Sequence, residues 1–152
     1  MVDQRERVLF LCTGNSARSL MAEALLRHHA GDRFEAHSAG AEPIGVRPET
    51  ALVLEEVGID PSVLRSKGVD EYLGKTHFGY LITVCGIEEE RCPRIWPGAS
   101  HHLHWPIPDP ASVEGEGRLD AFRAARDAIE TRILEWLEED APAEAAAEEE
   151  RS

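Results

Sequence analysis

The sequence has few basic residues, few cysteines and no long apolar run, and each shortage excludes a class of protein. Its 16 lysines and arginines stand against 29 aspartates and glutamates, which gives a formal net charge of −13. That charge argues against nucleic acid or an anionic membrane surface as a partner. No stretch approaches the about 18 apolar residues of a membrane span, and the first residues lack the apolar region of a secretory signal. We therefore expect a cytoplasmic protein.

The chain contains three cysteines, Cys12, Cys85 and Cys92. In a reducing compartment three cysteines cannot form a structural disulfide framework, and an odd number suggests chemistry. A length of 152 residues suits one domain with a core of its own. We expect this domain to span residues 1–139, and residues 140–152 to form an acidic, disordered tail.

Strand patterns alternate with helical patterns along the chain. Apolar runs over residues 8–11 and 78–84 predict two buried strands, and residues 34–38 and 102–105 predict two more. Residues 86–100 carry no periodicity and predict a long loop. Helical spacing and end signals predict helices over residues 18–30, 48–57, 69–73 and 119–137. This order indicates an α/β fold, a parallel sheet with helices on both faces.

Three reactive side chains follow directly on predicted strands. Cys12 and Cys85 come at the ends of the two buried strands, and Asp109 follows the last strand between two prolines. Functional sites of open α/β sheets lie beyond the carboxyl ends of the strands, at a topological switch point. We therefore expect these three residues to share one site.

The segment from Cys12 to Ser19 combines a nucleophile with an anion receptor. Arg18 offers two parallel donors that match the oxygens of phosphate or arsenate. The helix that follows, Arg18 and the Ser19 hydroxyl together favour a thiolate. An inert core cysteine would leave Arg18 after an all-polar turn unexplained. Backbone N–H groups that can point inward at an oxyanion come from Thr13, Gly14, Asn15, Ser16 and Ala17, with Gly14 easing the turn.

These residues resemble a known family. The run from Val8 to Ser19, followed by Met21-Ala22-Glu23, His37-Ser38-Ala39-Gly40 and Pro108-Asp109-Pro110, is similar to the low-molecular-weight tyrosine phosphatase superfamily. The resemblance covers most of the chain except the tail. It implies a four-stranded parallel sheet, with Cys12 as nucleophile, Arg18 as oxyanion binder and Asp109 as general acid. Taken alone, Asp109 could equally begin a β-turn.

The other two cysteines favour one branch of the superfamily, the thioredoxin-coupled arsenate reductases. That resemblance implies that Cys12 attacks arsenate and forms an arseno-cysteine. Cys85 then attacks Cys12 and releases arsenite, and Cys92 moves the disulfide to Cys85–Cys92, where thioredoxin reduces it. Phosphatases of this family tend to place tyrosines after the Asp-Pro pair, whereas residues 111–113 are Ala-Ser-Val.

Further expectations rest on the same resemblance. Ala17 stands where many relatives carry a second cysteine, which leaves Cys85 as the resolving thiol. Phosphate or sulfate should compete with arsenate, and we expect a monomer with no tightly bound cofactor. The alternatives are phosphomonoester hydrolysis, an idle oxyanion-binding domain, and glutaredoxin or mycothiol as reductant. Positions that brace the loop, and in some members bind potassium, correspond to Asn15, Glu23, Ser38 and Asp70; loop-bracing hydrogen bonds without a metal explain Asn15 and Ser38 equally well.

Overall fold

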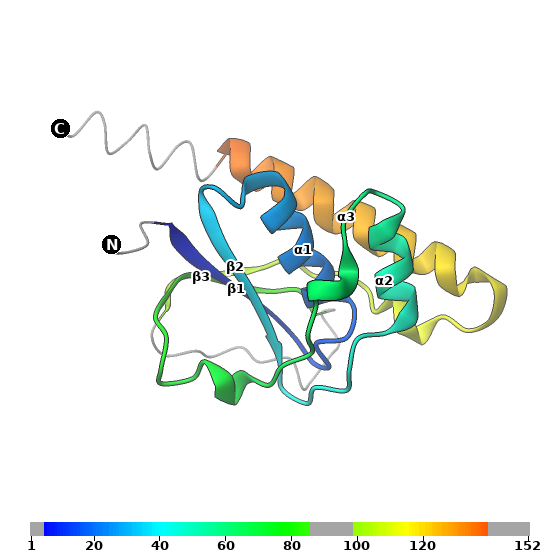
Figure 1. Cartoon of the computed structure of the whole chain (residues 1–152), viewed down its shortest axis with the longest axis horizontal. Helices are drawn as coiled ribbons and strands as arrows, with labels where there is room; N and C mark the ends of the chain where they lie inside the picture. The colour runs from blue at the N-terminus through cyan, green and yellow to red at the C-terminus, as the bar shows by residue number, and fades with distance from the viewer. Residues whose placement is uncertain (1–4, 86–98, 140–152) are drawn as a thin grey trace.

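Figure 1 shows the computed structural model, which describes residues 5–85 and 99–139. Cys92, residues 86–98 of the predicted loop and the predicted tail over residues 140–152 lie outside the described residues. The strands are β1 (Glu6–Cys12), β2 (Phe34–Gly40), β3 (Phe78–Thr83) and β4 (Ala99–His104). The α-helices are α1 (Arg18–Ala30), α2 (Pro48–Glu55) and α3 (Arg118–Glu139), and the 3₁₀ turns are η1 (Pro61–Val63), η2 (Val69–Glu71), η3 (Pro110–Ser112) and η4 (Gly115–Gly117).

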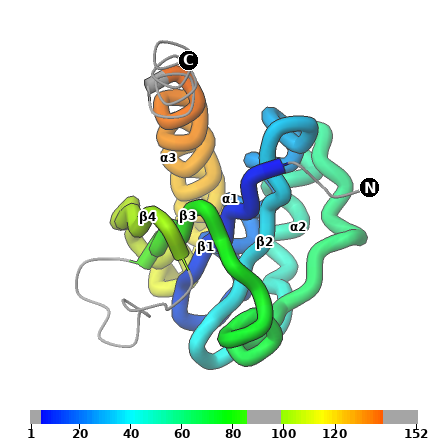
Figure 2. Tube along the Cα trace, turned by 90° about the vertical axis from the view of Figure 1, so that its left-hand side faces the viewer, coloured from blue at the N-terminus to red at the C-terminus, as the bar shows by residue number. Residues whose placement is uncertain are grey.

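The four strands form one parallel sheet in the order β2-β1-β3-β4, as Figure 2 shows. The predicted four-stranded parallel sheet is thereby confirmed. The chain goes from β1 to β2 on one side and continues with β3 on the other side of β1. A topological switch point therefore lies between the carboxyl ends of β1 and β3. Leu11 pairs with Thr83 across these strands, so Cys12 and Cys85 both come just after the same point.

The two faces of the sheet are covered differently. Val8 and Phe10 of β1 belong to the larger core, to which α1, α2 and α3 all contribute. Leu9 and Leu11 point to the opposite face, where Val69 and Tyr72 at η2 pack over them. Helical segments therefore cover both faces as predicted, although on the second face the described residues provide the 3₁₀ turn η2 rather than an α-helix. None of the helices in residues 5–85 and 99–139 is both long and apolar enough to cross a bilayer.

Differences from the predicted elements are largest where side chains are exposed. Strand β4 begins at Ala99, three residues earlier than predicted, and includes two residues assigned to the loop. It is an edge strand whose side chains are mostly exposed, so it lacks the apolar alternation that marks a half-buried strand. The helix predicted over residues 69–73 is the 3₁₀ turn η2, and α2 ends at Glu55 rather than Val57.

Candidate active site

The loop between β1 and α1 holds its carbonyl groups outward. Because C=O and N–H point in opposite directions across a trans peptide, outward carbonyls turn the following N–H groups of Gly14, Asn15 and Ala17 toward the centre of the loop. This orientation supports the predicted anion receptor. The carbonyls of Thr13, Gly14 and Ser16 accept hydrogen bonds from the backbone N–H groups of Glu42, Ile44 and Arg47 at 2.8, 3.1 and 3.2 Å, and the Thr50 hydroxyl also donates to Ser16 at 2.7 Å.

A directed chain of hydrogen bonds ends at the Cys12 sulfur. The backbone N–H of Lys67 donates to Asn15 Oδ1 at 2.7 Å, so the amide of Asn15 presents its nitrogen to Ser19 Oγ, also at 2.7 Å. Ser19 Oγ lies 2.8 Å from Cys12 Sγ; either atom can donate when Cys12 is a thiol, and Ser19 must be the donor when it is a thiolate. The chain therefore links the Lys67 backbone to the Cys12 sulfur through Asn15 and Ser19, and it places the Ser19 hydroxyl where it can donate to the sulfur.

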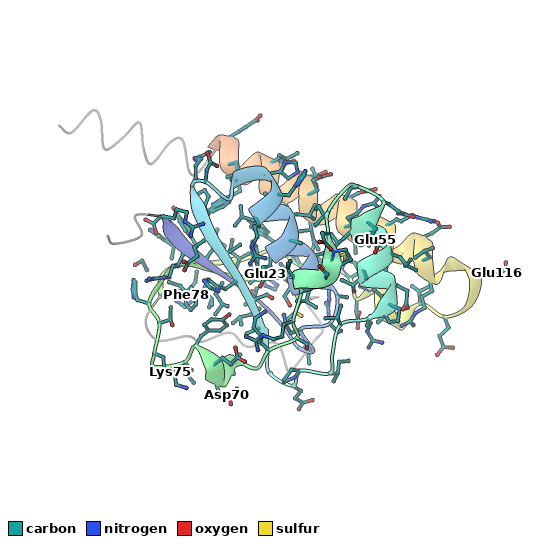
Figure 3. The ribbon with its side chains drawn as sticks, in the orientation of Figure 1. Glu23, Glu55, Asp70, Lys75, Phe78 and Glu116 are labelled. Carbon is teal, nitrogen blue, oxygen red and sulfur yellow. The ribbon has the colours of Figure 1, made fainter. Side chains whose placement is uncertain are left out.

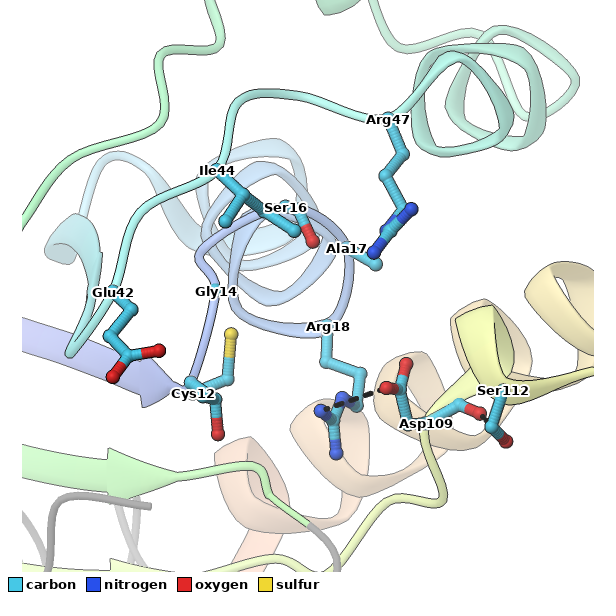
Figure 4. Close-up of a pocket in the computed structure, with 11 residues that line it drawn as sticks. Cys12, Gly14, Ser16, Ala17, Arg18, Glu42, Ile44, Arg47, Asp109 and Ser112 are labelled. Atoms are coloured by element: carbon cyan, nitrogen blue, oxygen red, sulfur yellow. Dashed lines mark hydrogen bonds and ion pairs between the residues drawn. The ribbon is translucent and has the colours of Figure 1, made fainter. Parts of the chain in front are cut away.

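Arg18 and Asp109 meet at the mouth of the loop. Arg18 is 4% exposed, and its Nη1 donates to the carbonyl of Ile107 at 3.0 Å. Its Nη2 lies 3.8 Å from Asp109 Oδ2, as the dashed line in Figure 4 shows. Asp109 Oδ1 also accepts from the backbone N–H of Ala111 and caps η3. The turn interpretation of Asp109 is therefore confirmed, and its other oxygen faces Arg18, whereas its role as general acid stays a prediction.

A pocket of about 520 Å³ opens over the loop. Figure 4 shows Arg47 reaching from the start of α2 toward Ala17, on the far side of the pocket from Glu42. Arg47 Nε is buried and has no hydrogen-bond partner among the described residues. Sequence reasoning missed this second arginine because it precedes a helix far from the loop in sequence. The lining residues are Cys12, Thr13, Gly14, Ser16, Ala17, Arg18, Glu42, Ile44, Arg47, Asp109 and Ser112.

The second cysteine lies next to the loop. Cys85 is fully buried, follows β3 directly, and its Sγ lies 3.9 Å from the carbonyl oxygen of Leu11. Cys12 is a free thiol, whereas Cys85 is disulfide-bonded. The structure therefore brings Cys12, Cys85 and Asp109 to one edge of the sheet, as predicted, while Cys92 lies outside the described residues.

The residues predicted to surround potassium do not converge on one point. The Ser38 hydroxyl donates to Glu23 Oε1 at 2.9 Å, and both side chains are buried. Asp70 is exposed on η2, and Figure 3 shows it well away from Glu23. The ammonium group of Lys67 lies beside Glu23 and Ser38 instead. No group of three or more histidine, cysteine or acidic side chains within the described ranges is placed to hold a metal ion.

Two residues other than Gly14 set the shape of the loop. Its backbone turns through the left-handed region at Asn15, with φ of 43°, a conformation that asparagine tolerates better than most residues. Gly40, at the end of β2, allows that strand to approach the loop. A Cβ there would lie 2.7 Å from the Asn15 nitrogen and 2.8 Å from the Thr13 oxygen. The loop therefore packs directly against the end of a strand.

Comparison with known proteins places this site in a family. Residues 7–149 match the family described as low molecular weight phosphotyrosine protein phosphatase. The chain belongs to this family. The predicted resemblance is thereby confirmed, since the family match includes the loop, both strand-end residues and Asp109.

Similar proteins within the family carry a more specific description. An arsenate reductase of Halalkalibacterium halodurans is 40% identical over 134 residues, which cover 86% of this chain and 94% of the relative. A solved structure described as an arsenate reductase in the phosphate binding state has a TM-score of 0.73 and 28% identity, covering 86% of this chain and 95% of the other. A thioredoxin-dependent arsenate reductase of Corynebacterium glutamicum has a TM-score of 0.66 and 30% identity, covering 91% of this chain and 63% of that one.

Proposed function

We propose that the chain reduces arsenate to arsenite with three thiols, and that thioredoxin returns it to the reduced state. One observation carries the proposal: the free thiol of Cys12 sits in an oxyanion loop at the strand end neighbouring that of a second cysteine, Cys85. A hydrolase needs only the first of these thiols. The relatives described as arsenate reductases, including the thioredoxin-dependent one, support the same reaction.

In the first step the Cys12 thiolate attacks arsenic. An S–As bond forms, and one As–O bond breaks as that oxygen takes a proton from Asp109 and leaves as water. Arg18, which is itself buried, and the inward N–H groups hold the remaining oxygens and stabilise their charge. Asp109 is placed for this role because it lines the same pocket as Cys12 and Arg18.

In the second step the Cys85 thiolate attacks Cys12 Sγ. The S–As bond breaks and its electron pair stays on arsenic, which passes from As(V) to As(III) and leaves as arsenite after taking up protons. Cys92 then attacks Cys85 and frees the Cys12 thiolate, and the thioredoxin dithiol reduces the disulfide that remains. The sum is arsenate plus a dithiol giving arsenite, a disulfide and water.

Phosphomonoester hydrolysis is the alternative on the same loop. It would use Cys12, Arg18 and Asp109 and would leave Cys85 without a role. None of the described residues that line the pocket is aromatic, so the site offers no ring on which an aromatic phosphoester could stack. We therefore favour a small inorganic oxyanion as substrate, with phosphate or sulfate as a competitor for the same loop.

One coupled assay tests the proposal. Purified protein is supplied with arsenate, thioredoxin, thioredoxin reductase and NADPH, and NADPH oxidation is followed. We expect steady turnover by the wild type, none by Cys12→Ser, and at most one arsenite released per chain by Cys92→Ser. Equal activity of wild type and Cys92→Ser would show that the relay is wrong. Rapid p-nitrophenyl phosphate hydrolysis that is indifferent to Cys85→Ser would favour the phosphatase.

A further inference from the structure

The carboxylate of Glu23 is buried in the middle of the fold and is matched by cations of the chain itself. Glu23 is 4% exposed, and Lys67, 6% exposed, places its Nζ 3.3 Å from Glu23 Oε1. The other oxygen of Glu23 lies 3.4 Å from Arg27 Nη2. An isolated buried carboxylate would be costly, and the two neighbouring cations offset that cost.

The ammonium group of Lys67 has a full set of acceptors. It has three hydrogens to donate, and three oxygens surround it: the carbonyl of Arg65 at 2.7 Å, Glu23 Oε1 at 3.3 Å and Ser38 Oγ at 3.5 Å. Two of these acceptors, Glu23 and Ser38, are among the four residues expected to hold a potassium ion. A metal ion placed between them would have to displace Nζ or lie against two cationic side chains. The residues present therefore do not fit a bound potassium ion.

The backbone of the same lysine begins the hydrogen-bond chain that leads to Cys12. Its N–H orients Asn15, and its carbonyl accepts the N–H of Gly40 at 2.9 Å. Gly68 forms a further bridge with Gly40, so the segment containing Lys67 runs alongside the end of β2. The Lys67 side chain therefore anchors this segment to Glu23 of α1 and Ser38 of β2, while its backbone N–H binds Asn15 of the oxyanion loop.

We propose that the Lys67 ammonium is a built-in cation that takes the place of a bound monovalent metal ion at Glu23 and Ser38, and that it positions Asn15 and Ser19 beside Cys12. Lys67 is thus a positioning residue, since it acts on the sulfur only through Asn15 and Ser19. The chain then needs no potassium for the order of its loop. The proposal concerns the resting protein and holds whether the loop serves a reductase or a phosphatase.

The first measurement uses the wild-type chain and no variant. Its Tm and the rate at which iodoacetamide alkylates Cys12, located by peptide mass, are measured in potassium chloride and in choline chloride of equal ionic strength. With Cys85 in its disulfide, Cys12 is the free thiol among the described cysteines. We expect both readouts to be the same in the two salts. A Tm or an alkylation rate raised by potassium alone would overturn the proposal.

The second measurement removes the ammonium by Lys67→Met, which keeps most of the side-chain stem. We expect the Tm to fall by about 5–10 °C in choline chloride, because one partner of a buried pair is lost. Cys12 alkylation should slow severalfold, and potassium should restore part of both. The matched control is Lys75→Met, since Lys75 is the other lysine of the chain and is exposed. It should behave as wild type in either salt.

A double variant keeps the test decisive if Lys67→Met folds poorly. In Glu23→Gln with Lys67→Met no charge is left uncompensated at this position except that of Arg27, which is about half exposed. We expect this protein to fold and to be indifferent to potassium, because the carboxylate that would attract the ion is gone. A Lys67→Met protein that is destabilised yet indifferent to potassium, or one that is unchanged, would overturn the proposal.

Discussion

Replacing Gly40 by alanine tests how closely the end of β2 holds the oxyanion loop. The new methyl group would lie 2.7 Å from the nitrogen of Asn15 and 2.8 Å from the oxygen of Thr13. Both are backbone atoms, so neither can rotate away, and the loop or the strand has to move. Overpacking of this kind costs about 1–3 kcal/mol, which for a chain of this length lowers the Tm by roughly 2–12 °C.

The same displacement should reach the chemistry. A shift of about 1 Å in groups that position a substrate can lower a rate by about 100-fold, and Asn15 carries both an inward N–H and the amide that orients Ser19. We therefore expect Gly40→Ala to lose 10- to 100-fold in kcat/KM for arsenate. The measurements are thermal unfolding and the coupled NADPH assay, and circular dichroism checks that the fold is kept.

Gly117→Ala is the control for this experiment. A Cβ at Gly117 would meet only a Val113 side-chain carbon at 3.8 Å, which is an ordinary contact. We expect this variant to match the wild type in Tm and activity, or to be slightly more stable. If Gly40→Ala also kept wild-type Tm and kcat/KM, the contact between β2 and the loop would not constrain the site, and the reasoning would be refuted.

Three more predictions follow from single side chains. Arg47→Ala should raise the KM for arsenate about tenfold with little change in kcat, because it removes a charged donor from the pocket wall; a loss in kcat alone would contradict this. The hydrogen bond from Arg118 holds the pKa of Glu49 below its ordinary value, so the stabilisation is present at neutral pH and lost as the pH falls through the folded-state pKa. The Tm gap between wild type and Glu49→Gln should therefore close below about pH 4, and a gap that is constant with pH would refute the pairing. An amine-acylating reagent followed by peptide mass analysis should modify exposed Lys75 well before buried Lys67, and equal rates would contradict the burial of Lys67.

The sequence predicts the parts of the fold that rest on local patterns. The buried run of β1, the helix that begins at Arg18 and the position of Cys85 after β3 all follow from apolar periodicity and strand ends. The sequence predicts the start of β4 three residues too late, because the mostly exposed side chains of this edge strand show no alternation of apolar and polar residues. The resemblance grouped Glu23 and Ser38 with Asn15 and Asp70; the structure joins Glu23 to Ser38 across 15 positions but leaves Asp70 exposed elsewhere.

Contacts between segments that are far apart in the chain could not be predicted from local sequence patterns. Lys67 lies in a stretch without regular structure, and its partner Glu23 is 44 residues away, so no periodicity connects them. Arg47 reaches the pocket only because α2 is placed beside the loop. The roles predicted for Asp109 and Cys92 remain predictions, as does the boundary of the domain at residue 139.

The outward carbonyls of the loop have a consequence for sequence change. Because recognition of the anion is built largely from peptide groups, the side chains at positions such as Ala17 can vary without removing the donors that face the ligand. The contacts that must be preserved are the hydrogen bonds that hold the loop from residues distant in sequence, such as those from the backbone of Arg47 and Lys67. A search for variants with altered oxyanion preference should therefore keep the hydrogen bonds to the loop carbonyls and randomise the side chains of Ile44 and Ser112, which line the pocket. Both natural sequence change and directed evolution can therefore alter these side chains without loss of the oxyanion-binding N–H groups.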